Sequence, residues 1–197
     1  PGVPDIYQGC ELWDLSLVDP DNRRPVDYEA RRAALAEIRR SFDVALPATA
    51  IDGLLRDWPS GRIKLFVIWR LLALRRSLPE LFRAGGYVPV EIEGARAGNL
   101  CCFVRSHADA VVLVAVPRLV AAWVTPERLW AEAEGIWHDT TIVLPEGLRP
   151  AGMRSVFTGE TVALDTGDAA DGRLPAARLL SGLPVAVHVG HLSAAAT

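Results

Sequence analysis

The residues best equipped for chemistry are gathered at the start of the chain. Two turn-forming prolines, Pro1 and Pro4, and then Gly9 lead into a stretch rich in aspartate, asparagine, glutamate, arginine and aromatic side chains. Together these side chains supply hydrogen-bond donors, hydrogen-bond acceptors and flat apolar rings. A loop of this composition suits the hydroxyl groups of a sugar, and the rest of the sequence has no stretch of similar density.

The same stretch resembles a known family. Residues 1–9, PGVPDIYQG, resemble the segment that follows the eighth barrel strand in the α-amylase clan of glycoside hydrolases. The longer run PGVPDIYQGCELWDLSLVDPDNRRPVDYEARRAAL, residues 1–35, is closer to the members of the clan that act as intramolecular glucosyl transferases. Residues 71–87 are similar to the clan's passage into its C-terminal β domain, and residues 155–164 and 179–190 to the closing strands of that domain.

This resemblance implies a place in a (β/α)8 barrel. The loops that follow the barrel strands build the active site, so the loop after strand eight faces the substrate. Retaining glycosyl transfer needs two carboxyl groups about 5 to 5.5 Å apart. In the clan this pair and a third, stabilising Asp lie upstream of the segment that matches Pro1. We therefore expect a C-terminal fragment, which lacks an initiator Met, has no catalytic residue and is inactive alone.

The resemblance also implies which side chains contact sugar. The loop expected to grip or orient glucose hydroxyls next to the cleavage point contains Asp19, Asp21, Asn22, Arg23 and Arg24. Weaker candidates for contact with the same substrate are Tyr7, Gln8, Glu11 and Trp13.

Each of these residues also has a structural interpretation. Residues 19–22 fit an ordinary turn, in which Asp and Asn side chains bond to nearby backbone groups. Arg23 or Arg24 could pair with a neighbouring carboxylate to hold the loop. The tyrosine and the tryptophan could pack on the barrel rim, and Glu11 could accept hydrogen bonds from backbone N–H groups.

The expected function is that of a larger enzyme. By resemblance, the parent converts the reducing-end α-1,4 link of a maltooligosaccharide into an α,α-1,1 link, and its partners are this substrate and an upstream catalytic barrel in the same polypeptide. No cofactor is implied, because chemistry of this type runs on carboxylates alone. Two alternatives stay open: a non-catalytic carbohydrate-binding or scaffold module, and an amylase-type maltooligosaccharide hydrolase.

Composition and charge argue against several other classes of protein. A net charge of −3 over 197 residues gives no basic surface for nucleic acid. No apolar run reaches the roughly 18 uncharged residues of a membrane span. The odd number of cysteines, Cys10, Cys101 and Cys102, suggests no disulfide framework, and we expect a cytoplasmic protein. His188 and His191 have no nearby Cys or acidic partner in the sequence, so we expect no metal site.

The first part of the sequence is typical of helices. Asp27 can cap a helix whose apolar side chains share one face, and Pro59 ends a second helix. Trp58 and Trp69 lie on apolar helical faces and are predicted to be core residues. A third helix, residues 62–76, is apolar nearly all round and needs cover on more than one side. A short fourth helix begins near Ser77 and ends at residues 85–86.

After residue 86 the pattern alternates, which indicates strands. We expect an alternating run over residues 88–92, a hairpin of residues 100–105 and 111–116, a short helix at 126–134, and further strands at 140–144, 154–157, 161–164, 177–180 and 185–189. The predicted fold class is therefore α+β. It joins the end of a (β/α)8 barrel, residues 1–85, to an antiparallel β-sandwich domain, residues 86–197.

Overall fold

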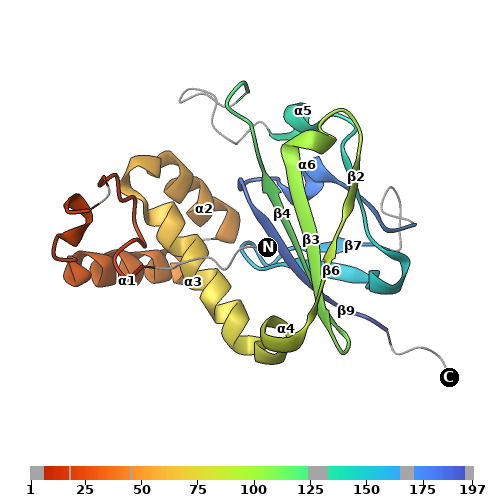
Figure 1. Cartoon of the computed structure of the whole chain (residues 1–197), viewed down its shortest axis with the longest axis horizontal. Coiled ribbons are helices and arrows are strands. Elements are labelled where there is room, and N and C mark those ends of the chain that lie inside the picture. Colours follow the sequence, from red (N-terminus) through yellow and green to blue (C-terminus); the bar gives the residue numbers. More distant parts are fainter. Residues whose placement is uncertain (1–6, 18, 45, 124–132, 165–170, 194–197) are drawn as a thin grey trace. The chain divides into compact units, whose positions relative to one another are not determined.

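The computed structural model describes residues 7–17, 19–44, 46–123, 133–164 and 171–193. The chain forms two compact units, Pro1–Ala73 and Leu74–Thr197. The first is helical, and the second contains all the described strands (Figure 1). The division lies inside α3 (Arg62–Ser77). The domain boundary that we expect between residues 85 and 86 stays a prediction.

The helical unit follows the sequence signals closely. Besides α3, its elements are η1 (Asp21–Arg23), α1 (Tyr28–Val44), α2 (Pro47–Arg56) and η2 (Trp58–Ser60). The side chain of Asp27 caps α1, because its Oδ1 accepts a hydrogen bond of 2.9 Å from the Ala30 amide. Pro47 lies in the first turn of α2, where a missing N–H costs no helical hydrogen bond. The predicted helices are therefore confirmed.

Aromatic side chains join α1 to α3. The rings of Phe42 and Phe66 stack at 4.7 Å, and Trp69 meets both rings edge-on. Phe66 is fully buried, whereas Leu72 in the second half of α3 is 50% exposed. The predicted cover on several sides therefore holds only for the first half of the helix within the described residues.

The prediction for Trp58 was wrong in part. Trp58 lies in η2 rather than on a continuous helix, and 37% of it is exposed. Pro59 is the physical reason, because proline disfavours the helical conformation in the residue before it. Trp69 is partly buried, between the aromatic rings of its own unit and the guanidinium of Arg39.

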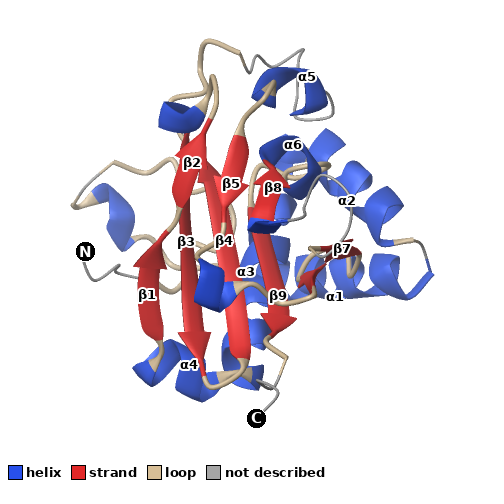
Figure 2. Ribbon diagram, turned by 90° about the vertical axis from the view of Figure 1, so that its right-hand side faces the viewer, coloured by secondary structure: helices blue, strands red, loops and turns tan. Residues whose placement is uncertain are grey.

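The second unit contains two antiparallel sheets (Figure 2). Their strands are β1 (Gly86–Pro89), β2 (Glu91–Glu93), β3 (Leu100–His107), β4 (Ala110–Pro117), β5 (Thr141–Val143), β6 (Gly152–Ser155), β7 (Thr161–Ala163), β8 (Arg173–Pro175) and β9 (Ala186–His191). The strand order is β1-β3-β4-β9-β6-β7 in the larger sheet and β2-β5-β8 in the smaller one. The unit also contains α4 (Pro79–Ala84), α5 (Ala133–Trp137), α6 (Ala176–Leu179), η3 (Ala97–Asn99) and η5 (Glu146–Leu148).

The hairpin of β3 and β4 is confirmed and is longer than expected. The two strands pair from Leu100 opposite Pro117 to His107 opposite Ala110. Ala108 occupies the turn with a φ of 52°. On its other side β4 pairs with β9, and β9 also pairs with β6. The last described strand, β9, therefore lies inside the larger sheet, between β4 and β6.

Two predicted strands differ in the structure. The alternating run over residues 88–92 divides at Val90, so that β1 joins the larger sheet and β2 the smaller one. Val90 is buried, and its amide bonds to the Cys102 carbonyl at 3.1 Å. The strand predicted at 177–180 was wrong, because that segment forms α6, whose turn is closed by the Leu180 amide on the Ala176 carbonyl at 3.0 Å. Alanine, arginine and leucine all favour helix.

One further boundary moved, and one predicted element is untested. The strand expected at 154–157 is β6 and begins two residues earlier, at Gly152. The short helix expected at 126–134 lies almost wholly outside the described residues, and the nearest described helix is α5.

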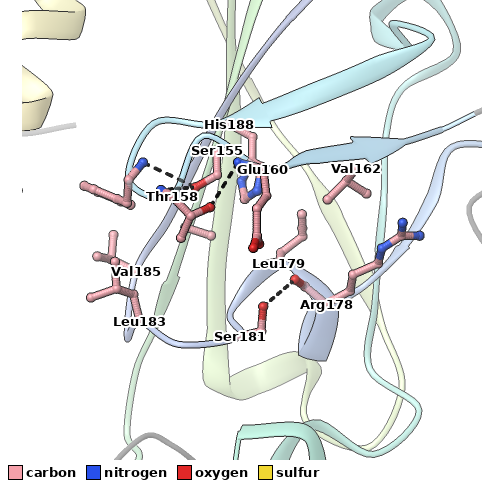
Figure 3. Close-up of a pocket in the computed structure, with 12 residues that line it drawn as sticks. Ser155, Thr158, Glu160, Val162, Arg178, Leu179, Ser181, Leu183, Val185 and His188 are labelled. Atoms are coloured by element: carbon pink, nitrogen blue, oxygen red, sulfur yellow. Dashed lines mark hydrogen bonds between the residues drawn. The ribbon is translucent and has the colours of Figure 1, made fainter. Parts of the chain in front are cut away.

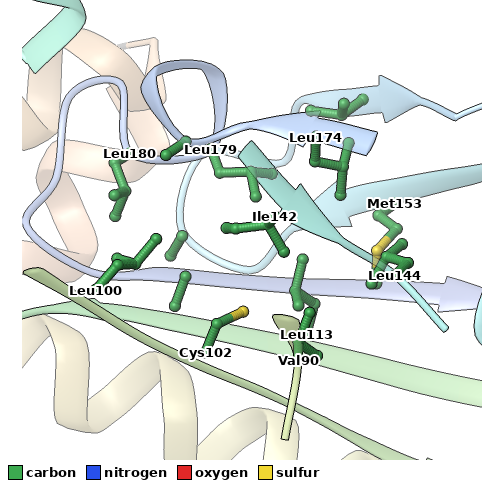
Figure 4. Close-up of a cluster of buried hydrophobic side chains, with 14 of the residues drawn as sticks. Val90, Leu100, Cys102, Leu113, Ile142, Leu144, Met153, Leu174, Leu179 and Leu180 are labelled. Atoms are coloured by element: carbon green, nitrogen blue, oxygen red, sulfur yellow. The ribbon is translucent and has the colours of Figure 1, made fainter. Parts of the chain in front are cut away.

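One hydrophobic core receives side chains from both sheets (Figure 4). The larger sheet contributes Leu113 from β4 and Met153 from β6 to this core. The smaller sheet contributes Ile142 from β5 and Leu174 from β8. All four have no exposed area. A shared core explains why both sheets belong to one compact unit. The antiparallel β-sandwich and the barrel end that we expect stay predictions.

Candidate functional site

Four of the five polar residues of the candidate sugar loop form two ion pairs with one another. Arg23 pairs with Asp19 through two contacts, one of them a hydrogen bond of 2.8 Å from Nη2 to Oδ2. Arg24 pairs with Asp21, with 3.3 Å between Nη2 and Oδ1. The turn of η1 brings each arginine back toward its aspartate. Both arginines, rather than one, therefore have the structural role that the sequence left open.

These ion pairs leave the loop accessible. The side chains of Arg23 and Arg24 are 74% and 67% exposed, and Asn22 is also exposed. Ion pairs as exposed as these contribute about 1 kcal/mol or less to the stability of the fold, because water and salt screen the charges. A ligand with suitable hydroxyls could therefore replace them at low cost.

Backbone contacts fix the start of the loop. The Leu17 amide donates to Oδ2 of Asp21 at 2.8 Å, so one carboxylate binds an arginine and a backbone group at once. Leu17 itself is 76% exposed and Leu15 is 93% exposed. Two apolar side chains next to the polar loop thus lack cover within the described residues.

Glu11 belongs to a different group, centred on Arg31. Arg31 Nε lies 3.0 Å from Oε2 of Glu11, and the Gly9 amide donates to Oε1 at 3.3 Å. Burial raises the pKa of Glu11, but hydrogen bonds from the amides of Glu11 and Gly9 and from Arg31 outweigh it and hold the pKa below its usual value. Glu11 therefore accepts backbone N–H groups, as its structural interpretation proposed.

Trp13 packs against a second tryptophan. Its Nε1 donates a hydrogen bond of 2.6 Å to the Trp58 carbonyl, and the two rings lie 5.2 Å apart. Lys64 covers the Trp13 ring at 5.6 Å and binds the Leu12 carbonyl at 3.2 Å. Gly61 approaches so closely that a Cβ there would lie 2.6 Å from the Trp13 amide nitrogen. These contacts favour a packing role for Trp13.

The carboxylate of Asp14 is influenced by charges from both the candidate sugar loop and the neighbourhood of Trp13. Hydrogen bonds from the hydroxyl and amide of Ser16 lower its pKa, and the positive charges of Arg24 and Lys64 add to the effect. The arginine of the loop and the lysine beside Trp13 thus act on one carboxylate.

The two remaining candidates differ in their contacts. Tyr7 is 68% exposed. Gln8 is exposed too, and its Oε1 accepts a hydrogen bond of 3.1 Å from the hydroxyl of Tyr28. Gln8 thus ties the start of the described chain to the first turn of α1.

Sequence reasoning missed Arg31 and Lys64. A positive charge in the first turn of α1 opposes the helix dipole, so Arg31 needed an acidic partner, and this was the available signal. Lys64 is the only lysine of the sequence, but nothing in the sequence indicates that it contacts Trp13.

The two histidines of β9 differ in exposure and lie on opposite faces of the strand. His188 is 4% exposed, whereas His191 is exposed, with its Nδ1 3.2 Å from Oδ2 of Asp109. In a strand, residues three apart point to opposite faces. Within the described ranges, no group of three or more His, Cys, Asp or Glu side chains could hold a metal ion. No helix in the same ranges has the length and hydrophobicity to cross a membrane.

Comparison with known proteins found two curated relatives and two solved structures that are similar to this chain. No family profile matches the chain. Two curated relatives from Mycobacterium tuberculosis, strains CDC 1551 and H37Rv, are 39% identical to it over 189 residues. A solved structure from Arthrobacter ramosus has a TM-score of 0.61 and 35% identity, and the structure of a mutant of the same protein has 0.64 and 36%. All four matches cover 96% of this chain.

The proteins in all four matches have the same name. The Arthrobacter protein is maltooligosyltrehalose synthase, and the Mycobacterium proteins are provisionally named maltooligosyl trehalose synthase. The chain spans about one fifth of their length, 19% of the curated relatives and 20% of the solved chains. Its homologues are thus maltooligosyltrehalose synthases, and its mixture of helices and antiparallel sheets is similar to their C-terminal region.

Proposed function

We propose that this chain is the C-terminal part of an intramolecular glucosyl transferase. The complete enzyme converts the reducing-end α-1,4 link of a maltooligosaccharide into an α,α-1,1 link and so leaves a trehalose terminus. The observation that carries this proposal is identity of 35% to 39% with maltooligosyltrehalose synthases over 96% of the chain. The exposed polar loop at residues 19–24 supports it.

The chemistry is divided between two parts of the polypeptide. The upstream barrel supplies the nucleophile and the acid/base carboxylate that retaining transfer requires. This chain supplies part of the wall of the site. Its loop holds the released glucose so that the anomeric hydroxyl attacks, which makes the step effectively unimolecular. Water must be excluded meanwhile, because capture of the intermediate by water gives hydrolysis.

The loop suits this task for a physical reason. Arg23 and Arg24 each hold an exposed carboxylate, and those weak pairs can open when sugar hydroxyls approach. Asn22 adds an amide that both donates and accepts. The exposed side chains of Leu15 and Leu17 are then covered by the upstream barrel.

The test compares the complete enzyme with variants of this loop. Incubation of the parent with maltopentaose should yield trehalose-ended product, and Arg23→Ala and Arg24→Ala should each reduce kcat/KM at least tenfold, with a larger share of free glucose. Arg40→Ala, an exposed arginine on α1, is the matched control and should leave the rate unchanged. The isolated chain should form no product.

Three results would overturn the proposal. Release of glucose alone by the parent would assign it to amylase-type hydrolysis. Unchanged rates in both loop variants would remove the loop from the site. Product from the isolated chain would show that the upstream carboxylates are not needed.

A further inference from the structure

One guanidinium joins the two ends of the segment that contains the candidate sugar loop. Before the segment, Arg31 pairs with Glu11, with 3.0 Å between Nε and Oε2, and its Nη2 donates to the Gly9 carbonyl. After the segment, its Nη1 donates to the Asp27 carbonyl at 3.0 Å. All three nitrogens of this side chain are therefore engaged, and residues 12–26 begin and end beside it.

The two ends of the segment also pack against each other. Residues 9–11 and 26–28 form this base of the loop. Gly9 has a φ of 97°, and a Cβ on it would lie 2.5 Å from Cγ2 of Val26. The backbone therefore approaches the valine as closely as only glycine allows. Compact surface loops whose ends meet in this way are frequently functional.

Beyond its base, the loop bonds mostly to itself. Among the described residues from 14 to 24, each hydrogen bond ends on another residue of the same stretch. At the start of the segment, Trp13 bonds to η2 and Leu12 to α3. The polar loop at residues 19–24 therefore takes its position from the base and from this one neighbouring contact.

The ion pair at the base is less exposed than those within the loop. The side chains of Arg31 and Glu11 are 20% and 30% exposed, whereas that of Arg23 is 74% exposed. Water screens a charge pair less as the pair becomes buried. The base is therefore the firm part of the loop, and the pairs at its far end are the part that opens to a ligand.

We propose that Arg31 is a positioning residue for the loop at residues 19–24, because it joins both ends of the segment that holds this loop. This inference rests on the proposed function, in which the loop holds the released glucose. Arg31 acts through the loop and touches no sugar. A misplacement of about 1 Å can lower the rate about a hundredfold. A loosened loop also lets the glucose leave and water enter, so hydrolysis replaces isomerisation.

Lysine at position 31 tests this role with little change to the helix. An ammonium keeps the positive charge beside Glu11, but it is a single point and lacks the planar fork that reaches three partners. Arg31→Lys therefore leaves a charge at the base and loosens the hold on one end of the loop.

The first measurement is the product ratio of the complete enzyme with maltopentaose. Arg31→Lys should raise the share of free glucose at least threefold and lower kcat for trehalose-ended product at least fivefold, with KM within about twofold of wild type. KM changes little because the loop acts on glucose after cleavage. A purely structural role would reduce the amount of folded enzyme and leave the ratio of the two products unchanged.

The second measurement is amide hydrogen exchange, followed by mass spectrometry in the same proteins. Peptides that cover residues 14–24 should exchange at least tenfold faster in Arg31→Lys than in wild type, because the loop opens more often. Gly9→Ala is an independent variant that opens the base from its other side, since the new Cβ meets Val26. It should raise both the exchange and the share of free glucose.

Two arginines serve as matched controls. Arg62 lies in the same unit and pairs with Glu37 at 2.7 Å, away from the base of the loop. Arg178 is an exposed arginine of the second unit and lines a small pocket there (Figure 3). Arg62→Lys and Arg178→Lys should both keep the product ratio and the loop exchange of wild type.

Three outcomes would overturn the inference. The first is unchanged exchange of residues 14–24 in Arg31→Lys, which means that Arg31 does not hold the loop. The second is faster exchange with a wild-type product ratio, which means that the position of the loop does not decide the fate of the glucose. The third is an equal rise of free glucose in Arg31→Lys and Arg62→Lys, which indicates general destabilisation.

Failure here is distinguishable from failure of the proposed function. If the wild-type parent forms trehalose-ended product and Arg31→Lys keeps its product ratio, only the role of Arg31 is refuted. If the wild-type parent releases glucose alone, the proposed function fails, and amide exchange still decides whether Arg31 holds the loop.

Discussion

Arg31 and Glu11, 20 residues apart in the sequence, form a half-buried ion pair with 3.0 Å between Nε and Oε2. The same guanidinium donates to the carbonyls of Gly9 and Asp27. One side chain of α1 therefore holds the segment that leads into the candidate sugar loop. The pair is the main described link between residues 9–11 and the helix.

Removing this arginine should destabilise the chain. Arg31→Met leaves the Glu11 carboxylate and the Gly9 carbonyl without their partner, and we expect a loss of about 1 to 2 kcal/mol. Urea unfolding monitored by circular dichroism measures it. Arg40→Met on the exposed face of α1 is the control and should stay within about 0.5 kcal/mol of wild type. Equal losses in both variants would contradict the role given to Arg31.

Glu11 should add an acid-dependent part to this stability. Its folded pKa lies below the ordinary 4.5, so its contribution is present above about pH 4.5 and is lost as pH falls through the folded value. Glu11→Gln should therefore flatten the fall in unfolding free energy between about pH 5 and 3, in a urea series at several pH values. An unchanged slope would contradict the prediction.

The two adjacent glycines after α4 should respond very differently to alanine. A Cβ on Gly85 would lie 2.3 Å from the Leu81 carbonyl oxygen and 2.8 Å from that of Ser106, whereas the nearest atom to one on Gly86 is 3.6 Å away. Arg105 donates to the carbonyls of both Leu81 and Gly85, which leaves the backbone little freedom to move. Gly85→Ala should cost about 2 to 3 kcal/mol and Gly86→Ala less than about 1. Thermal unfolding of the two variants compares them directly. Similar melting temperatures would show that the backbone around Gly85 has room for a Cβ.

His188 should make the chain less stable in mild acid. Its pKa is about 4 in the folded chain and near 6.5 when unfolded, so the unfolded state binds the proton first. The stabilising effect of the neutral ring is complete above about pH 6.5 and is lost as pH falls toward 4, a change of about 3 kcal/mol. His188→Gln should remove this pH dependence, and His107→Gln in the exposed hairpin turn should keep it. A series of urea unfolding curves from about pH 8 to 4 tests both variants, and equal slopes would refute the assignment.

Neighbouring cysteines on β3 should react at very different rates. Cys101 is exposed, and Cys102 on the opposite face of the strand is 6% exposed. Burial, with the adjacent Cys101 thiol as a smaller cause, raises the pKa of Cys102 to about 12. The thiolate is the reactive form, so iodoacetamide at about pH 8 should label Cys101 at least a hundredfold faster. Tandem mass spectrometry locates the label, and chemical denaturation should equalise the rates. Rapid labelling of Cys102 in the folded chain would contradict the burial of this strand face.

Local signals in the sequence account for most of the helical unit and part of the sheets. Asp27 predicts the start of α1, Pro59 limits the helix before it, and Gly85 marks the end of α4. The alternating residues on either side of Ala108 predict the hairpin of β3 and β4. Each of these signals acts over a few neighbouring residues, so an isolated sequence contains it in full.

Within the candidate site, the sequence by itself identified the polar loop but not its internal pairs. It left open which arginine binds a carboxylate, and the turn of η1 brings both close enough to do so. The partner of Arg31 and the contact between the rings of Trp13 and Trp58 were also undecided, because each joins residues far apart in the chain.

The sequence alone thus determined the main helices, the central hairpin and the position of the polar loop at residues 19–24. Only the tertiary structure decided that β1 and β2 separate at Val90. It also placed β9 between β4 and β6, which leaves the imidazole of His188 buried without a partner among the described residues. The physical reason is that strand pairing and burial depend on residues distant in the sequence, whose contacts outweigh the weak local preference of a short segment.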